Sequence, residues 1–162
     1  MRIFLDTNVI LENFLVREDF KTAHNLFHAM QGQKHELFMS VGSFYTMIFL
    51  VDKYLRKVIG LIGDDRVKML RQIMSNILQA VSVAEHDNES LLRGIKNEAF
   101  KDVEDGCQYE LAIKAGCTLL LTFNSHDFPS DGKGNVKVMT PAEYLEQQGD
   151  TGDTGTGPSS HF

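Results

Sequence analysis

The chain has 162 residues, the length of one domain of ordinary size. Its 43% hydrophobic and 23% charged residues are typical of a globular protein with a substantial core. Sixteen Lys and Arg against 22 Asp and Glu leave a net charge of −6, which argues against tight non-specific binding of nucleic acid. An enzyme that meets phosphates through metal ions stays compatible with this charge.

The sequence predicts a cytoplasmic protein. No apolar run approaches the ~20 residues that a membrane-spanning helix needs, and the N-terminus does not have the layout of a signal peptide. Cys107 and Cys117 form no CxxC pair, which suits a reducing compartment and argues against a disulfide scaffold or a zinc–thiolate site.

The first half of the chain alternates short apolar runs with stretches of helical periodicity. After the first run, at 2–5, Val9, Ile10, Phe14 and Leu15 recur at helical spacing. The pattern then predicts helices over 20–30, 43–59 and 64–78, and short strands over 36–40 and 80–83.

The second half continues the alternation. Asn88 is a candidate cap for a helix that ends near Glu98, and a helix over 105–115 is stopped by Gly116. Strands are predicted over 118–122 and 136–139. Residues 140–143 (TPAE) place a cap, a first-turn proline and a capping-box glutamate in order, so a last helix begins there.

These elements predict an α/β domain with a central parallel sheet covered by helices on both faces. We expect this domain to span residues 1–146. Residues 147–162 contain almost nothing apolar and are predicted to be a disordered polar tail.

Acidic residues stand where such a fold places ligands, beyond the carboxyl ends of the strands. Asp6 ends the first strand, Asp127 lies five residues past Thr122, and Asp102, Glu104 and Asp105 cluster where a helix begins. Right-handed crossovers bring these positions to one rim. Massed carboxylates repel unless a cation lies between them, and Mg²⁺ or Mn²⁺ suits hard oxygen ligands.

Each acidic residue also has a purely structural explanation. Asp102 can be a helix cap, with Asp105 completing an imperfect capping box or lying on the surface. Asp127 can form a turn, and Asp6 can simply end its strand. Taken together, the acidic residues favour a site for a single metal ion, with the helix dipole favouring the anionic form of Asp105.

Several motifs resemble PIN-domain proteins, the fold of VapC-like ribonucleases. The opening segment Asp6-Thr7-Asn8-Val9-Ile10-Leu11 is the most specific of them. Segments 102–108 (DVEDGCQ), 119–124 (LLLTFN) with 127–128 (DF), and 140–145 (TPAEYL) follow in the order and spacing of that family. The resemblance covers roughly residues 1–146 and implies a three-layer α/β sandwich.

The resemblance also implies an activity and partners. It implies hydrolysis of RNA phosphodiesters with Mg²⁺ or Mn²⁺, with Asp6, Asp105 and either Asp127 or Asn124 at the site. It implies the toxin of a toxin–antitoxin pair, with an antitoxin held in an apolar groove framed by the helices at 20–30 and 43–59, and a homodimer.

The chain departs from the family pattern at the start of the helix after the second strand. A glutamate is usual there, but residues 40–45 (SVGSFY) contain no carboxylate. Ser40 or Ser43 could hold a water without supplying charge. Glu12 is a possible substitute for the missing acid, or else part of a solvated helix face. Gly106 stands where alanine is commoner, and Phe123 where a basic residue is usual.

Two further polar residues are candidates for supporting roles. Asn8 either orients a carboxylate or a water, or caps the first helix. Thr122 is placed to hydrogen-bond a carboxylate, as ligands of a metal commonly require. The main basic concentration either holds RNA phosphates or forms solvated helix faces; it comprises Lys53, Arg56, Lys57, Arg66, Lys68 and Arg71.

The sequence leaves three classes of function open. The first is a metal-dependent endoribonuclease. The second is a PIN-fold module that has lost catalysis and binds RNA or a protein, which the missing glutamate favours. The third is a phosphohydrolase or receiver-like domain with Asp6 as a phosphorylated nucleophile, against which the absence of a DxD continuation counts.

Overall fold

The computed structural model describes residues 1–15, 19–31, 33–129 and 136–150. A five-stranded sheet lies at its centre, with strand order β3-β2-β1-β4-β5 and every neighbouring pair parallel. The strands are β1 (Arg2–Leu5), β2 (Glu36–Met39), β3 (Ser82–Val83), β4 (Leu119–Leu121) and β5 (Lys137–Met139). The predicted α/β fold with a parallel sheet is confirmed.

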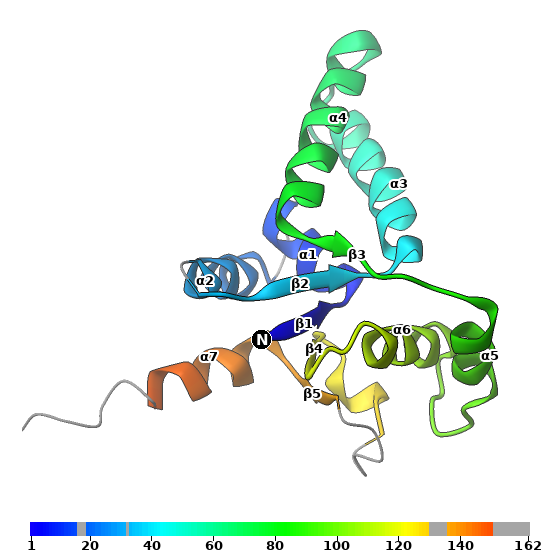
Figure 1. The fold of residues 1–162 in the computed structure, drawn as a ribbon. Coiled ribbons are helices and arrows are strands. Elements are labelled where there is room, and N and C mark those ends of the chain that lie inside the picture. The colour runs from blue at the N-terminus through cyan, green and yellow to red at the C-terminus, as the bar shows by residue number, and fades with distance from the viewer. Residues whose placement is uncertain (16–18, 32, 130–135, 151–162) are drawn as a thin grey trace, which may run out of the picture.

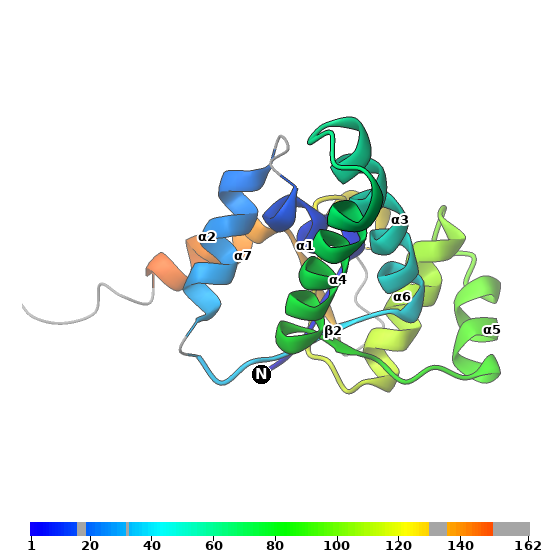
Figure 2. The same cartoon turned by 90° about the horizontal axis from the view of Figure 1, so that it is seen from above.

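Helices cover both faces of this sheet, so the protein has three layers. Figure 1 shows α3 and α4 rising as a pair from one side of the sheet, with α5 and α6 on the other side; Figure 2 shows the arrangement from above. The helices are α1 (Thr7–Phe14), α2 (Phe20–Met30), α3 (Val41–Lys57), α4 (Gly63–Ala80), α5 (Asn88–Lys96), α6 (Val103–Lys114) and α7 (Pro141–Asp150), with a short 3₁₀ helix at Ser125–Asp127. None of the described helices is long and apolar enough to cross a membrane.

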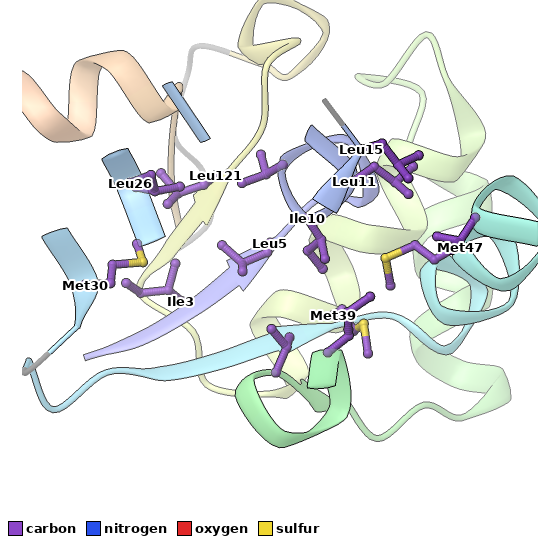
Figure 3. Close-up of a cluster of buried hydrophobic side chains, with 14 of the residues drawn as sticks. Ile3, Leu5, Ile10, Leu11, Leu15, Leu26, Met30, Met39, Met47 and Leu121 are labelled. Carbon is purple, nitrogen blue, oxygen red and sulfur yellow. The ribbon is translucent and has the colours of Figure 1, made fainter. Parts of the chain in front are cut away.

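Alternation along the central strands divides the core in two. Ile3 and Leu5 of β1 face a cluster that includes side chains from α1, α2, α3, α4 and α7. Figure 3 shows part of this cluster. Phe4, between them, joins the opposite cluster with Leu111 and Ala112 of α6. Successive side chains of a strand point to opposite faces, so an uninterrupted apolar strand is buried on both.

The strand register brings the end of β1 beside the end of β4. Leu5 pairs with Leu121, and the Asp6 N–H donates to the Leu121 carbonyl at 3.0 Å. The residues that directly follow these strands, Asp6 and Thr122, are therefore neighbours although 116 positions separate them in the chain. This neighbourhood is the basis of the site.

Most predicted element boundaries hold within two residues, and three corrections are needed. The α5 cap is Asp87 rather than Asn88, because the Asp87 side chain accepts from the Ser90 N–H and the Ser90 hydroxyl completes the box. The third strand is limited to Ser82–Val83, since α4 continues to Ala80. Helix α7 continues through Asp150, so the predicted polar tail cannot begin at 147; its remainder, 151–162, lies outside the described residues.

Two glycines allow α5 to approach α6 closely. A Cβ on Gly94 would lie 2.5 Å from the Cys107 Cα, and a Cβ on Gly106 would lie 2.7 Å from the Gly94 carbonyl oxygen. These are backbone atoms, which cannot move aside as a flexible side chain would. Gly106, a departure from the family pattern, is therefore required by this helix contact, and it directly follows Asp105.

We expect Gly94→Ala to lower the free energy of unfolding by about 1–3 kcal/mol, because the added methyl group forces α5 away from α6. Urea denaturation of the full chain measures this change. Gly42→Ala in α3 is the matched control, since its Cβ would meet only the Ser40 hydroxyl at 3.5 Å. The control should leave stability unchanged or raise it by up to about 1 kcal/mol. A Gly94→Ala protein as stable as the control would contradict the close-contact explanation.

Candidate active site

A polar cavity of about 230 Å³ lies beyond the carboxyl ends of β1 and β4, beside the start of α6. Its walls come from segments that are distant in the sequence. The lining residues are Asp6, Thr7, Asn8, Thr46, Leu50, Asp102, Glu104, Asp105, Gln108, Asn124 and Asp127. The structure thus brings all of the acidic residues predicted at the rim, Glu12 excepted, to one cavity.

Asp6 is the most buried carboxylate of the cavity, with 6% of its surface exposed. It occupies the N-cap position of α1, but its side chain makes no capping hydrogen bond. The carboxylate instead accepts from the Thr122 hydroxyl at 2.8 Å and from the Gln108 side-chain amide at 3.3 Å. It is thus held by groups from two other elements rather than by its own helix.

Thr122 makes the hydrogen bond to a carboxylate that the sequence predicts. Its hydroxyl donates to Asp6 and accepts from the Asn124 N–H at 3.1 Å. This fixes the start of the loop that carries Asn124 and Asp127 into the cavity. Asp127 also lies 3.5 Å from the ring of the exposed His126, an ion pair only when that histidine is protonated.

The first turn of α6 supplies three more carboxylates. Asp102 is the N-cap, and its side chain accepts from the Glu104 N–H at 2.7 Å. Asp102 therefore both caps the helix and lines the cavity. Glu104 and Asp105 follow within the first turn. No capping-box bond from Asp105 back to Asp102 is among the interactions of the described residues, so the predicted box is not formed.

Asp105 has an unusual acidity for a carboxyl group. Burial, with the negative charges of Asp6, Asp102, Asp127 and Glu104, raises its pKa from 3.8 to about 6. The pKa of Glu104 is also raised, by burial and by Asp6 and Asp102. The predicted effect of the helix dipole, which favours the anion, is therefore outweighed by desolvation and like charge.

Gln108 is the site residue that sequence reasoning missed. It lies one turn after Glu104, only 4% exposed, and its amide reaches both Asp6 and Glu104. A glutamine within a helix of mixed composition gives no periodic signal. Its spacing of four residues from Glu104 and three from Asp105 is the one clue, because those spacings share a helix face.

Of the two candidate residues on α1, Asn8 lines the cavity and Glu12 does not. Asn8 lines the cavity, and its alternative as the cap of the first helix is wrong because Asp6 holds that position. Glu12 is not among the lining residues. It is buried rather than solvated, and its carboxylate accepts from the Asp19 N–H at 3.1 Å. Glu12 therefore does not replace the acid missing from α3.

The start of α3 is organised by hydroxyl groups. Ser40 is the N-cap and accepts from the Ser43 N–H at 2.8 Å. The Ser43 hydroxyl accepts from Thr7 at 2.8 Å and lies 2.8 Å from the Ser40 hydroxyl. Neither serine lines the cavity. They tie α3 to α1, and Ser40 lines a neighbouring cavity with Glu104 and Gln108, so the role of holding a water stays a prediction.

The predicted basic concentration lies on the hairpin formed by α3 and α4. Lys53, Arg56, Lys57, Lys68 and Arg71 are exposed, and Arg66 is paired with Asp52. None of these residues lines the acidic cavity. Their positions are consistent with solvated helix faces.

The lining residues fit a hydrated divalent cation by their chemistry. Carboxylate and amide oxygens prefer Mg²⁺ or Mn²⁺, and Mg²⁺ commonly keeps several waters while binding one or two carboxylates. Throughout the described part of the chain, no three Asp, Glu, His or Cys side chains already form a metal-binding group. The cavity therefore offers acidic ligands without a closed cage of protein atoms.

Comparison with known sequences agrees with this arrangement. A model of the PIN domain family matches residues 2–126, from β1 to the loop after β4. Ribonuclease VapC1 of Aquifex aeolicus (strain VF5) is 29% identical over 152 residues, which cover 90% of this chain and 94% of that protein.

Two solved structures have the same fold. VapBC2 from Rickettsia felis, crystallised with a DNA fragment from its promoter, contains a chain with TM-score 0.59 and 12% identity, covering 86% of this chain and 98% of that one. VapBC-1 from nontypeable Haemophilus influenzae contains one with TM-score 0.58 and 15% identity, covering 88% and 99%. With a family match over most of its length and the corresponding fold, the chain belongs to the PIN domain family.

Proposed function

We propose that this protein is a PIN-type endoribonuclease that hydrolyses RNA phosphodiesters with Mg²⁺ or Mn²⁺. The observation that carries the proposal is the cavity at which five carboxylates from three segments meet, in a chain of this family. Its likeness to the Aquifex aeolicus ribonuclease supports the reaction class.

Within this proposal Asp6, Asp105 and Asp127 hold the cation. When bound, it lowers the pKa of water and offsets the negative charge that develops on the phosphate. Thr122 keeps the Asp6 carboxylate in place through its hydroxyl. Asn8 and Asn124 supply amide groups at the wall of the cavity, where they can hydrogen-bond a phosphate oxygen or a water.

The negative charge of the cavity disfavours binding of RNA in the absence of a cation. A phosphodiester is an anion, and Asp102, Glu104 and Asp105 present carboxyl groups to the same space. Without a cation, these groups repel the substrate as well as one another. A divalent ion held by these residues would offset this repulsion, so substrate binding and cation binding are coupled in the proposal.

A protein partner is part of the proposal. Several large apolar side chains are exposed on α3, α4 and the turn between them: Tyr45, Phe49, Val58, Ile59, Ile62, Met69 and Leu78. Such side chains suit a protein partner rather than a phosphate backbone. We propose an antitoxin as this partner, as the names of the two VapBC assemblies suggest. A second copy of the chain, which the resemblance to PIN-domain proteins implies, is a further proposed partner.

The resemblance to PIN-domain proteins implies that the antitoxin lies between α2 and α3. Helix α1 lies between α2 and α3 (Figures 1 and 2), so an antitoxin that contacts both α2 and α3 would also contact α1. A cytoplasmic location completes the proposal, since Cys107 and Cys117 are both free thiols.

Cleavage of a labelled RNA in Mg²⁺ or Mn²⁺ tests the reaction. We expect Asp6→Asn and Asp105→Asn to lower the rate by at least about 100-fold, because each removes a charge that holds the cation. Asp64→Asn, on the exposed start of α4, is the charge-matched control and should cleave like the wild type. Equal cleavage by all four proteins would remove the activity from this cavity. A wild type that binds RNA but never cleaves it would instead favour the binding module without catalysis.

The raised pKa of Asp105 predicts a pH-dependent stability in the absence of divalent ions. The folded protein keeps the proton more tightly than the unfolded chain, so stability from this group is present near pH 4 and is lost as the pH rises to about 6. At pH 7, Asp105→Asn should be more stable than the wild type by about 1–2 kcal/mol, allowing for solvent screening.

Urea denaturation between pH 4 and pH 7 in EDTA measures this difference. The gain from Asp105→Asn should shrink toward zero at pH 4, while Asp64→Asn should show no such trend. A gain that is absent at pH 7, or independent of pH, would contradict the clustering of charge around Asp105.

A further inference from the structure

Gln108 connects two of the carboxylates that line the cavity. Its Nε2 donates to Asp6 Oδ1 at 3.3 Å and to Glu104 Oε1 at 3.5 Å. Asp6 follows β1, whereas Glu104 belongs to the first turn of α6. The amide therefore links carboxylates of different elements across the cavity wall.

Glu104 needs such a link to stay at the cavity. Part of the residue is exposed to solvent, whereas its carboxylate is partly desolvated at the cavity and repelled by the negative charges of Asp6 and Asp102. A free glutamate in this situation turns toward solvent. Gln108, four residues later on the same helix face, offers an N–H that keeps the carboxylate beside Asp6.

An amide performs this task without cancelling the charge of the site. Lys or Arg at position 108 would bridge the carboxylates more strongly, but it would also place a fixed positive charge where a metal ion is to bind. The neutral amide lowers the repulsion between Asp6 and Glu104 and leaves both negative charges available.

The other end of the amide is a buried hydrogen-bond acceptor. Gln108 Oε1 is buried and accepts no hydrogen bond from the described residues. A buried acceptor without a partner is costly, and such a group in a native site commonly meets a water or an ion. Gln108 is only 4% exposed and lines both the acidic cavity and a neighbouring cavity that it shares with Ser40 and Glu104, so a water in either cavity can meet this acceptor.

We propose that Gln108 is a positioning residue that holds Glu104 beside Asp6, and that Glu104 thereby acts as a further cation-binding carboxylate. This inference rests on the proposed function. Glu104, at the start of α6, would then supply the carboxylate that PIN-domain proteins usually have at the start of α3 and that this chain lacks there.

Calorimetric titration of the full chain with Mn²⁺, in the absence of RNA, tests the proposal. Glu104→Gln and Gln108→Met should each weaken Mn²⁺ binding by roughly 10- to 100-fold, the effect typical of groups that orient metal ligands. Glu98→Gln, in the exposed turn before α6, is the charge-matched control for Glu104→Gln and should bind Mn²⁺ as the wild type does.

The double variant Glu104→Gln with Gln108→Met separates positioning from general packing. If Gln108 acts through Glu104, the loss in the double variant is clearly smaller than the product of the two single losses. Thermal unfolding in EDTA reports whether each variant is folded. Glu104→Gln changes a residue that is partly exposed to solvent, so it keeps the proposal testable even if Gln108→Met fails to fold.

Three results would overturn the proposal. Wild-type affinity in Glu104→Gln, together with weakened binding in Asp6→Asn, would remove Glu104 from the site and leave the proposed function intact. Fully independent losses in the double variant would show that Gln108 does not act through Glu104. A wild type that binds no Mn²⁺ would end both this proposal and the metal-dependent function.

Discussion

The repulsion among carboxylates in one cavity is the constraint on which the rest of this structure depends. Like charges do not gather unless other interactions hold them, and here the backbone does so. The parallel register places Asp6 next to Thr122, and the close contact of α5 with α6 sets the position of the helix that carries Asp105. Burial first, and then the neighbouring negative charges, raise the pKa of Asp105, which reflects the free-energy cost of placing a carboxylate here.

Such a free-energy cost is typical of binding sites in which the ligand neutralises the gathered charges. Buried strands with apolar residues on both faces supply the stability that allows an unfavourable cluster at their ends. Neutral donors such as the Thr122 hydroxyl and the Gln108 amide lower the repulsion without cancelling the charge. In the proposed function, this leaves the negative charge of the cavity available to a cation, and through the cation to a phosphate group.

The sequence was sufficient to predict the sheet and the meeting of Asp6, Asp105 and Asp127 at one cavity. Continuous apolar runs predict buried parallel strands, and the ends of such strands must meet, so Asp6 and Thr122 could be placed together. Gln108 could not be found this way, because its role depends on the distance between two helical neighbours and a strand end. The sequence also could not show the roles of Glu12 and Ser43. Glu12 accepts a hydrogen bond from the Asp19 N–H, and Ser43 accepts one from the Thr7 hydroxyl. The need for Gly106 became visible only with the partner helix in place.

The central claim is that these carboxylates share one divalent cation. A crystal structure of the protein grown with Mn²⁺, with anomalous differences measured at the manganese edge, tests it most directly. We predict a peak inside the cavity lined by Asp6, Asp105 and Asp127, with carboxylate oxygens among the ligands of the ion. A well-ordered cavity with no anomalous peak, in crystals soaked to saturating Mn²⁺, would contradict the account.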